Sequence, residues 1–194
     1  PERWRSEALD PFGHSFLEEI AGTNKRSRES RLRRIEKAVR LAIPQLTDLR
    51  LVSDDRSGSP HLQATHEHWR VHGAKMREDQ LSDGTLRLIG LLWMLLSGSG
   101  PLLLEEPELS LHEGVIRLLP QMFHRVMHRR SGGRRQIFVS THSSAMLSDS
   151  GISPEEILLL RPTEEETEVK RASQYQILQA LAKAGAPIGP AVIA

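Results

Sequence analysis

The chain has 194 residues, enough for one domain with a hydrophobic core, and it contains no cysteine. A chain without cysteine has no disulfide bond and no thiolate metal site. Its formal net charge at pH 7 is +1, so binding to nucleic acid would require a local basic patch rather than attraction by the whole molecule.

The apolar segments are too short to cross a membrane. The longest run extends from Leu88 to Leu104 and is interrupted at residues 97–101, so neither part approaches the roughly 20 residues that span a bilayer. The chain begins with Pro1 rather than Met and shows no signal-peptide pattern. We therefore expect a cytoplasmic segment of a longer protein, with no membrane partner.

Residues 1–78 are predicted to form a basic helix followed by an antiparallel β element. Leu32, Ile35 and Val39 recur at helical spacing among many Arg and Lys residues, which predicts a helix over 27–43 that ends before the next proline. Two segments with alternating apolar residues then flank a turn cluster of Asp, Ser, Gly and Pro. The predicted strands cover 46–52 and 61–71.

Residues 79–172 show strands alternating with helices, which is typical of a parallel α/β fold. The predicted elements are a helix over 85–96, a strand over 101–106, a helix over 113–130, and strands over 136–140 and 157–160. Because these strands are apolar throughout, we expect them to be buried on both faces of a mostly parallel sheet flanked by helices. Residues 173–194 are predicted to form a last helix, over 173–183, and a loose tail.

Ser82, Asp83 and Gly84 lie where the helix over 85–96 begins. The free N–H groups and the positive dipole at a helix N-terminus suit a phosphate group, and glycine lets the backbone approach an anion closely. Taken alone, these residues are explained better as a helix cap without a ligand.

Two acids, Glu105 and Glu106, directly follow a very apolar strand. Ligands of open α/β sheets bind at the carboxyl ends of the strands. One carboxylate there can hold Mg²⁺, directly or through water, and the next can orient an attacking water. A solvated acidic loop is the alternative interpretation.

His142 follows the next predicted strand. At that edge of a sheet, an imidazole can hydrogen-bond a γ-phosphate or the attacking water. A single histidine is more often structural, so His142 is informative only together with the preceding motifs. The Leu109–His112 segment just past the acids carries little information by itself.

The order and spacing of these four stretches resemble the C-terminal half of an ABC-type ATPase head. The Leu81–Gly84 segment resembles the signature motif, and Leu102–Glu106 resembles Walker B with its following catalytic acid. Leu109–His112 lies where the D-loop belongs, and His142 where the switch histidine belongs. The sequence Glu-Glu-Pro-Glu followed by Leu-His is similar to the RecF/SMC-like and overcoming-lysogenization-defect-like branch, whose members are AAA-family ATP-binding proteins.

This resemblance implies the cofactors ATP and Mg²⁺. It implies Glu105 as a metal ligand, Glu106 and His142 as catalytic residues, and Ser82, Asp83 and Gly84 as contacts to an ATP phosphate of the opposing subunit. It also implies ATP-dependent dimerisation, either as a homodimer or with a partner chain, and a role in DNA maintenance or defence against foreign DNA.

The sequence departs from that family at two points. Glu105 stands where the wider superfamily has Asp, although Glu remains a hard oxygen ligand. No G-x-x-x-x-G-K-[ST] phosphate-binding loop occurs in the chain, and the nearest approach is Gly22–Lys25. We therefore expect that the Walker A lobe has been lost, lies elsewhere in the parent protein or is supplied by a partner chain, and that the isolated chain is inactive. A non-enzymatic ATPase-like module that serves as a scaffold is the rival hypothesis.

Histidines and basic clusters offer further candidates. His66, His68 and His72 lie close in sequence, as do His124 and His128, but without cysteine or an HExxH pattern a zinc site is disfavoured. The basic clusters can be solvated surface or can contact a DNA backbone. These clusters cover 25–40 and 129–135.

Overall fold

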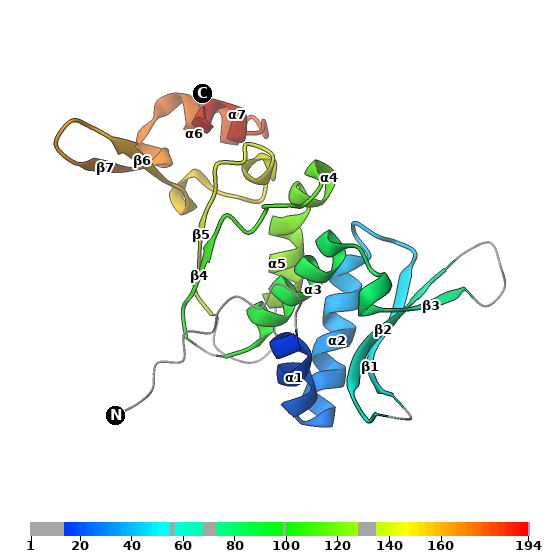
Figure 1. The fold of residues 1–194 in the computed structure, drawn as a ribbon. Helices are drawn as coiled ribbons and strands as arrows, with labels where there is room; N and C mark the ends of the chain where they lie inside the picture. Colours follow the sequence, from blue (N-terminus) through cyan, green and yellow to red (C-terminus); the bar gives the residue numbers. More distant parts are fainter. Residues whose placement is uncertain (1–13, 55–56, 68–72, 99, 128–134, 194) are drawn as a thin grey trace, which may run out of the picture. The chain divides into compact units, whose positions relative to one another are not determined.

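A computed structural model describes residues 14–54, 57–67, 73–98, 100–127 and 135–193 (Figure 1). The predicted features at 68–72 and 128–134 lie outside these ranges. The chain divides into two compact units, Pro1–Trp93 and Met94–Ala194, and each is described by itself below.

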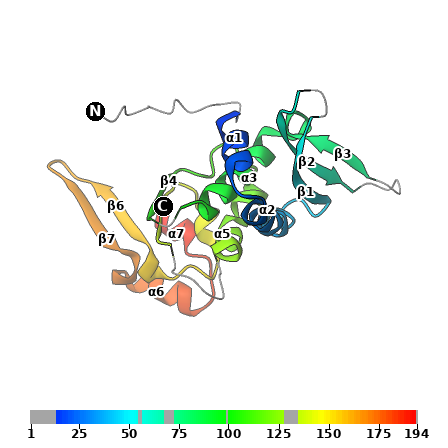
Figure 2. The same ribbon diagram turned by 90° about the horizontal axis from the view of Figure 1, so that it is seen from below.

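The first unit consists of helices and a three-stranded sheet. Its elements are α1 (His14–Gly22), α2 (Lys25–Val39), β1 (Leu46–Ser53), β2 (Pro60–His66), β3 (Ala74–Arg77), the 3-10 helix η1 (Glu78–Gln80) and the larger part of α3 (Asp83–Leu96). The sheet has the order β1-β2-β3, and both strand pairs are antiparallel (Figure 2). The predicted hairpin is therefore confirmed, and β3 adds a third strand that was not predicted.

Helix α2 follows the predicted pattern closely. Its start is fixed by Asn24, whose side chain accepts a hydrogen bond from the Ser27 N–H at 3.0 Å, as expected for an N-cap residue. The buried face carries Leu32, Ile35, Ala38 and Val39. The helix ends at Val39, earlier than predicted, because the next residues form tight turns toward a proline, which disfavours helical backbone in front of it.

The core of the first unit contains Trp93, which is 1% exposed. Its indole N–H donates to Glu19 at 2.9 Å, and Phe16 packs edge-on against it with ring centroids 6.5 Å apart. Since a buried indole N–H needs an acceptor, the bond to Glu19 lets this large side chain join α1 to α3.

The second unit contains two small sheets and short helices. Its elements are β4 (Leu102–Glu105), α4 (Glu113–Ile116), α5 (Leu119–Met127), β5 (Ile137–Ser140), η2 (Met146–Ser148), η3 (Pro154–Glu156), β6 (Leu158–Pro162), β7 (Thr167–Arg171), η4 (Ala172–Gln174), α6 (Gln176–Lys183) and α7 (Gly189–Ile193). The mixed α/β class, with a small parallel sheet and antiparallel strands, is confirmed.

Strands β4 and β5 pair in parallel as predicted, with Leu103 opposite Phe138. Leu102 and Leu104 are buried, but Leu103 is 77% exposed and Phe138 is 48% exposed. The prediction that these strands are buried on both faces is therefore wrong for the described chain. The described residues leave the face that carries Leu103 and Phe138 open.

The predicted helix over 113–130 is two helices. α4 ends at Ile116 and α5 begins at Leu119, with Pro120 in the first turn of α5. Proline lacks an N–H and restricts the residue before it, so it is tolerated at a helix start but breaks a helix interior. The prediction of one continuous helix overlooked this proline.

The third predicted strand does not join the parallel sheet. β6 instead pairs with β7 in an antiparallel hairpin, and only Leu159 of its leucines is buried, with Leu158 and Leu160 exposed. The tail is also better packed than predicted, because Ile188 is 3% exposed and joins the same apolar cluster as Leu178. An apolar run alone does not distinguish a central strand from a hairpin whose outer face is open.

None of the described helices is both long and apolar enough to span a bilayer.

Candidate functional site

The carboxyl ends of β4 and β5 bring the predicted catalytic residues together. Glu105 ends β4 opposite Ser140, which ends β5. The Glu106 N–H then donates to the Ser140 carbonyl at 3.0 Å, so the parallel pairing continues one residue past β4. This edge is where ligands of parallel sheets bind.

Glu106 and His142 lie side by side at this edge. The Glu106 Oε1 and the His142 Nε2 are 3.5 Å apart, and the His142 side chain is 92% exposed. Glu106 has a φ angle of 42°, which turns the chain out of the strand direction. A carboxylate next to an imidazole, both accessible, can orient and polarise a water molecule.

In the described part of the chain, Glu105, the residue before Glu106, makes no hydrogen bond or ion pair with either side chain of this pair. It is exposed and shares a face of β4 with Leu103, two residues earlier, because strand side chains alternate between faces. Among the described residues no group of three or more His, Asp or Glu side chains could hold a metal. The exposed Glu105 carboxylate can offer a Mg²⁺ ion one oxygen ligand, the other ligands would have to come from elsewhere, and this role stays a prediction.

A contact of the buried Glu108, not predicted from the sequence, joins the two loops that carry Glu106 and His142. The Thr141 hydroxyl donates a hydrogen bond to the Oε1 of Glu108, and Glu108 is 8% exposed. The other carboxylate oxygen, Oε2, is buried and has no partner among the described residues. A charged residue directly after Glu-Glu-Pro was the one available signal, and solvent exposure is the usual expectation for it.

At the start of α3, Ser82 acts as the predicted cap. Its hydroxyl accepts a hydrogen bond from the Thr85 N–H at 3.2 Å and lies 2.8 Å from the Thr85 hydroxyl. Ser82 and Asp83 are exposed, whereas Thr85 is buried. The capping geometry is confirmed, and a role for Ser82, Asp83 and Gly84 toward a nucleotide stays a prediction.

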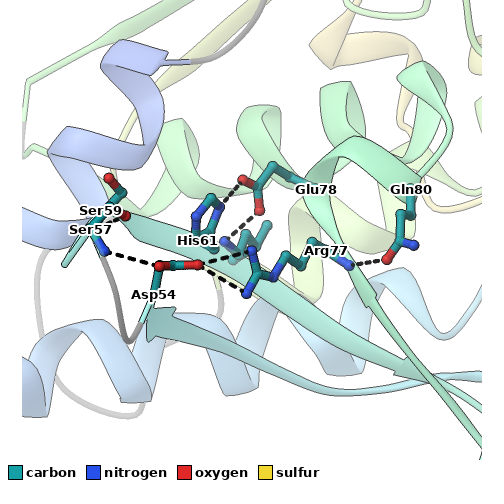
Figure 3. Close-up of polar contacts among 8 residues, drawn as sticks. Asp54, Ser57, Ser59, His61, Arg77, Glu78 and Gln80 are labelled. Carbon is teal, nitrogen blue, oxygen red and sulfur yellow. Dashed lines mark hydrogen bonds and ion pairs between the residues drawn. The ribbon is translucent and has the colours of Figure 1, made fainter.

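Glu78 connects the β-sheet of the first unit to the segment that leads into α3 (Figure 3). Its Oε1 lies 2.6 Å from the His61 Nδ1, and its Oε2 accepts from the Leu62 N–H at 2.8 Å. Nearby, Arg77 contacts Asp54 at 3.4 Å. Both oxygens of Glu78 are thus used to hold η1 against β2, four residues before Ser82.

The segment nearest to a phosphate-binding loop is a junction between two helices. Gly22 ends α1, and the Thr23 N–H and hydroxyl both bond to the Glu19 carbonyl. Asn24 caps α2. A phosphate loop joins a strand to a helix, so Gly22–Lys25 is not one.

Part of the basic surface has structural partners. Arg135 donates to the carbonyls of Gly100, at 2.6 Å, of Met94, at 2.7 Å, and of Ser97, so it fixes the end of α3. Arg31 stacks 5.2 Å from the Trp93 ring centroid. The remaining basic residues of the 129–135 cluster lie outside the described residues, as do His68, His72 and His128.

Residues 2–148 match the family model described as "AAA domain, putative AbiEii toxin, Type IV TA system". No curated protein matches the chain. The fold is similar to a solved structure from work on "ATP-driven dimerization and DNA stimulated activation of SMC ATPases". The identity is 14% and the TM-score 0.55, and the match covers 88% of this chain and 95% of that one.

The fold is also similar to the SmcHead solved with the C-winged helix domain of ScpA, at 13% identity and a TM-score of 0.51. This match covers 84% of the present chain and 51% of that one, so the chain spans about half the length of that SmcHead. At these identities the likeness shows the fold alone, which resembles that of SMC ATPase heads. Because the family model matches more than half of its residues, the chain belongs to the AAA domain family of the putative AbiEii toxin type.

Proposed function

We propose that this chain is the C-terminal half of an ATP-hydrolysing head of the RecF/SMC-like, overcoming-lysogenization-defect-like branch. The observation that carries the proposal is the approach of Glu106 to His142, 3.5 Å apart at the ends of two paired parallel strands. Membership in an AAA family implies nucleotide binding, for which Mg²⁺ is the usual companion.

The residues at the carboxyl ends of β4 and β5 have separate roles in hydrolysis. Glu106, the second acid of Walker B, accepts a proton from the water that attacks the γ-phosphate. His142, the switch histidine, orients that water or the phosphate through its imidazole. Glu105 would hold Mg²⁺ as one oxygen ligand, and the metal would supply charge neutralisation at the phosphates.

The head needs a second lobe that provides the Walker A loop. The open face of the β4–β5 sheet supports this requirement, since parallel sheets are normally covered on both faces and Leu103 and Phe138 are exposed here. The chain also spans about half of the SmcHead that it resembles. The Walker A lobe would therefore complete both the sheet and the phosphate site.

Dimerisation on ATP is the expected mode of action. Ser82, Asp83 and Gly84, in the signature motif, would contact an ATP phosphate held by the opposing subunit of a homodimer or of a partner chain. The exposed position of Ser82 and Asp83 at the start of α3 suits this role. The SMC ATPase of similar fold is described by its ATP-driven dimerization, which supports the same behaviour in this chain.

We also propose a role in DNA maintenance or in defence against foreign DNA, which the same comparisons support. The similar SMC ATPase is described as activated by DNA, and the family description names a toxin of a toxin–antitoxin system. The exposed basic residues of α2 are the described surface best suited to a DNA backbone.

Reconstitution tests the proposal. ATP turnover is measured for this chain alone, for the Walker A lobe alone and for the two together. We expect turnover above background only when the two are mixed, because the phosphate cradle of the Walker A lobe supplies most of the affinity for the triphosphate. Absence of turnover in the mixture, with ATP nevertheless bound, would favour the rival hypothesis of a non-enzymatic scaffold.

A further inference from the structure

The exposed pair of Glu106 and His142 cannot hold its own geometry. The two side chains are 3.5 Å apart and His142 is 92% exposed. A contact of this length is a weak hydrogen bond at best, and exposed ion pairs contribute little to stability. Another interaction must therefore set the positions of the two loops that carry these side chains.

The buried contact between Glu108 and Thr141 has the right place to do so. Glu108 lies two residues after Glu106, and Thr141 lies directly before His142. The hydrogen bond from the Thr141 hydroxyl to the Glu108 carboxylate joins these loops, which are separated by more than 30 residues of sequence. It is partly shielded from water, because Glu108 is 8% exposed, and an electrostatic hydrogen bond is stronger where water is excluded.

The Thr141 end of this contact is fixed to the backbone, and a separate backbone bond closes the loop that carries Glu108. The Thr141 hydroxyl accepts a hydrogen bond from the Ser143 N–H at 2.9 Å, so its own proton is directed toward Glu108. The Glu108 carbonyl accepts from the Leu111 N–H at 3.0 Å. Movement of the Thr141 hydroxyl would therefore disturb its bond to the Ser143 backbone N–H.

We propose that Glu108 and Thr141 are positioning residues that hold Glu106 and His142 in the geometry needed for hydrolysis. The inference rests on the proposed function, because it assigns a catalytic purpose to the contact. Neither residue touches the reacting atoms in this account. Their effect is on the placement of the carboxylate and the imidazole relative to the attacking water.

The proposal predicts different effects for two conservative changes. Thr141→Val keeps the shape of the side chain and removes the hydroxyl, which leaves the buried Glu108 carboxylate without its described partner. Thr141→Ser keeps the hydroxyl. In a head that contains this chain and its Walker A lobe, Thr141→Val should lower kcat by about 10²-fold, as expected for a misplaced catalytic group. The KM for ATP should stay unchanged, and Thr141→Ser should restore most of the rate.

Amide hydrogen exchange provides a readout that does not depend on turnover. The Glu106 N–H bonds to the Ser140 carbonyl, and both of these backbone groups are still present in the two Thr141 variants. In the full chain, Thr141→Val should speed exchange at Glu106 by about tenfold, the size expected for the loss of one hydrogen bond to a charged group. Exchange in β1 and β2 should not change. Thr163→Val is the matched control, because its hydroxyl bonds to the Glu166 carbonyl in an exposed turn of the same unit.

The outcomes separate the inference from the proposed function. If Glu106→Gln abolishes turnover while Thr141→Val turns over ATP like the parent, the positioning role is overturned and the proposed function stands. If Glu106→Gln turns over ATP normally, the proposed function fails, and the positioning role fails with it. Should Thr141→Val not fold, Thr141→Ala removes the same hydroxyl without adding an apolar branch, and the same outcomes apply.

Discussion

Glu106 leaves β4 with a φ angle of 42°, in the left-handed region that non-glycine residues rarely adopt. The sequence identified the acid and the histidine by type and order, because both follow apolar strands. It did not reveal this turn of the backbone at Glu106. It also did not reveal the hydrogen bond between Thr141 and the buried Glu108. These features depend on tertiary packing that no local pattern encodes.

Glu78 provides a test of stability at the residue scale. Glu78→Ala should lower the free energy of unfolding by about 1–3 kcal/mol, because the Leu62 N–H and His61 lose their acceptor. Urea denaturation of the full chain measures the change. Glu165→Ala, in an exposed turn, is the matched control, and equal losses for the two variants would contradict this assignment.

At the scale of elements, the start of α3 combines two roles that substitutions can separate. Ser82→Ala removes the cap and should cost about 1 kcal/mol of stability. Ser82→Arg should also abolish ATP-dependent dimerisation of the complete head while leaving ATP binding intact, because a bulky cation would obstruct the opposing nucleotide. Light scattering with ATP measures dimer formation. Unchanged dimerisation, compared with Ser150→Arg as a control, would rule out the signature assignment.

Helix α2 provides the test of DNA binding. Arg31 stacks on Trp93, so the exposed residues Arg33 and Lys37 are the better candidates. Reversing both to Glu should weaken DNA binding and reduce the slope of log K against log salt by about 1.8, since two phosphate contacts are lost. Reversing Arg125 and Lys183, which are also exposed, is the charge-matched control. Equal slopes for the two double variants would leave α2 as solvated surface.

Element types were predictable where one periodic pattern dominated. The apolar spacing of α2 and the alternation in β1 and β2 predicted these elements correctly. The prediction of one helix over 113–130 was wrong because Pro120 interrupts a long periodic pattern. The predicted sheet of β6 was wrong because its partner β7 is mostly polar and mostly exposed, so the sequence does not mark it as a strand. Strand pairing is also not a local property.

At the scale of the whole molecule, the proposed parts of an ATPase site lie in different units. Ser82, Asp83 and Gly84, the proposed signature residues, belong to the first unit, and Glu105, Glu106 and His142 belong to the second. The domain limits expected from sequence, 1–78, 79–172 and 173–194, remain a prediction. The exposed face of the β4–β5 sheet, with Leu103 77% exposed, supports the proposal that a further lobe completes the head.

The most direct test of the central claim compares Glu106→Gln, Glu105→Gln and His142→Ala in the complete head, by ATP turnover and dimer fraction across a Mg²⁺ titration. Glu106→Gln keeps the shape of the side chain and loses its charge, so we predict that it binds Mg-ATP and traps the dimer. Its turnover should fall by about 10²- to 10⁴-fold. Glu105→Gln should require more Mg²⁺ to dimerise, and His142→Ala should lose turnover without a strong trap. Normal turnover by Glu106→Gln would contradict the account.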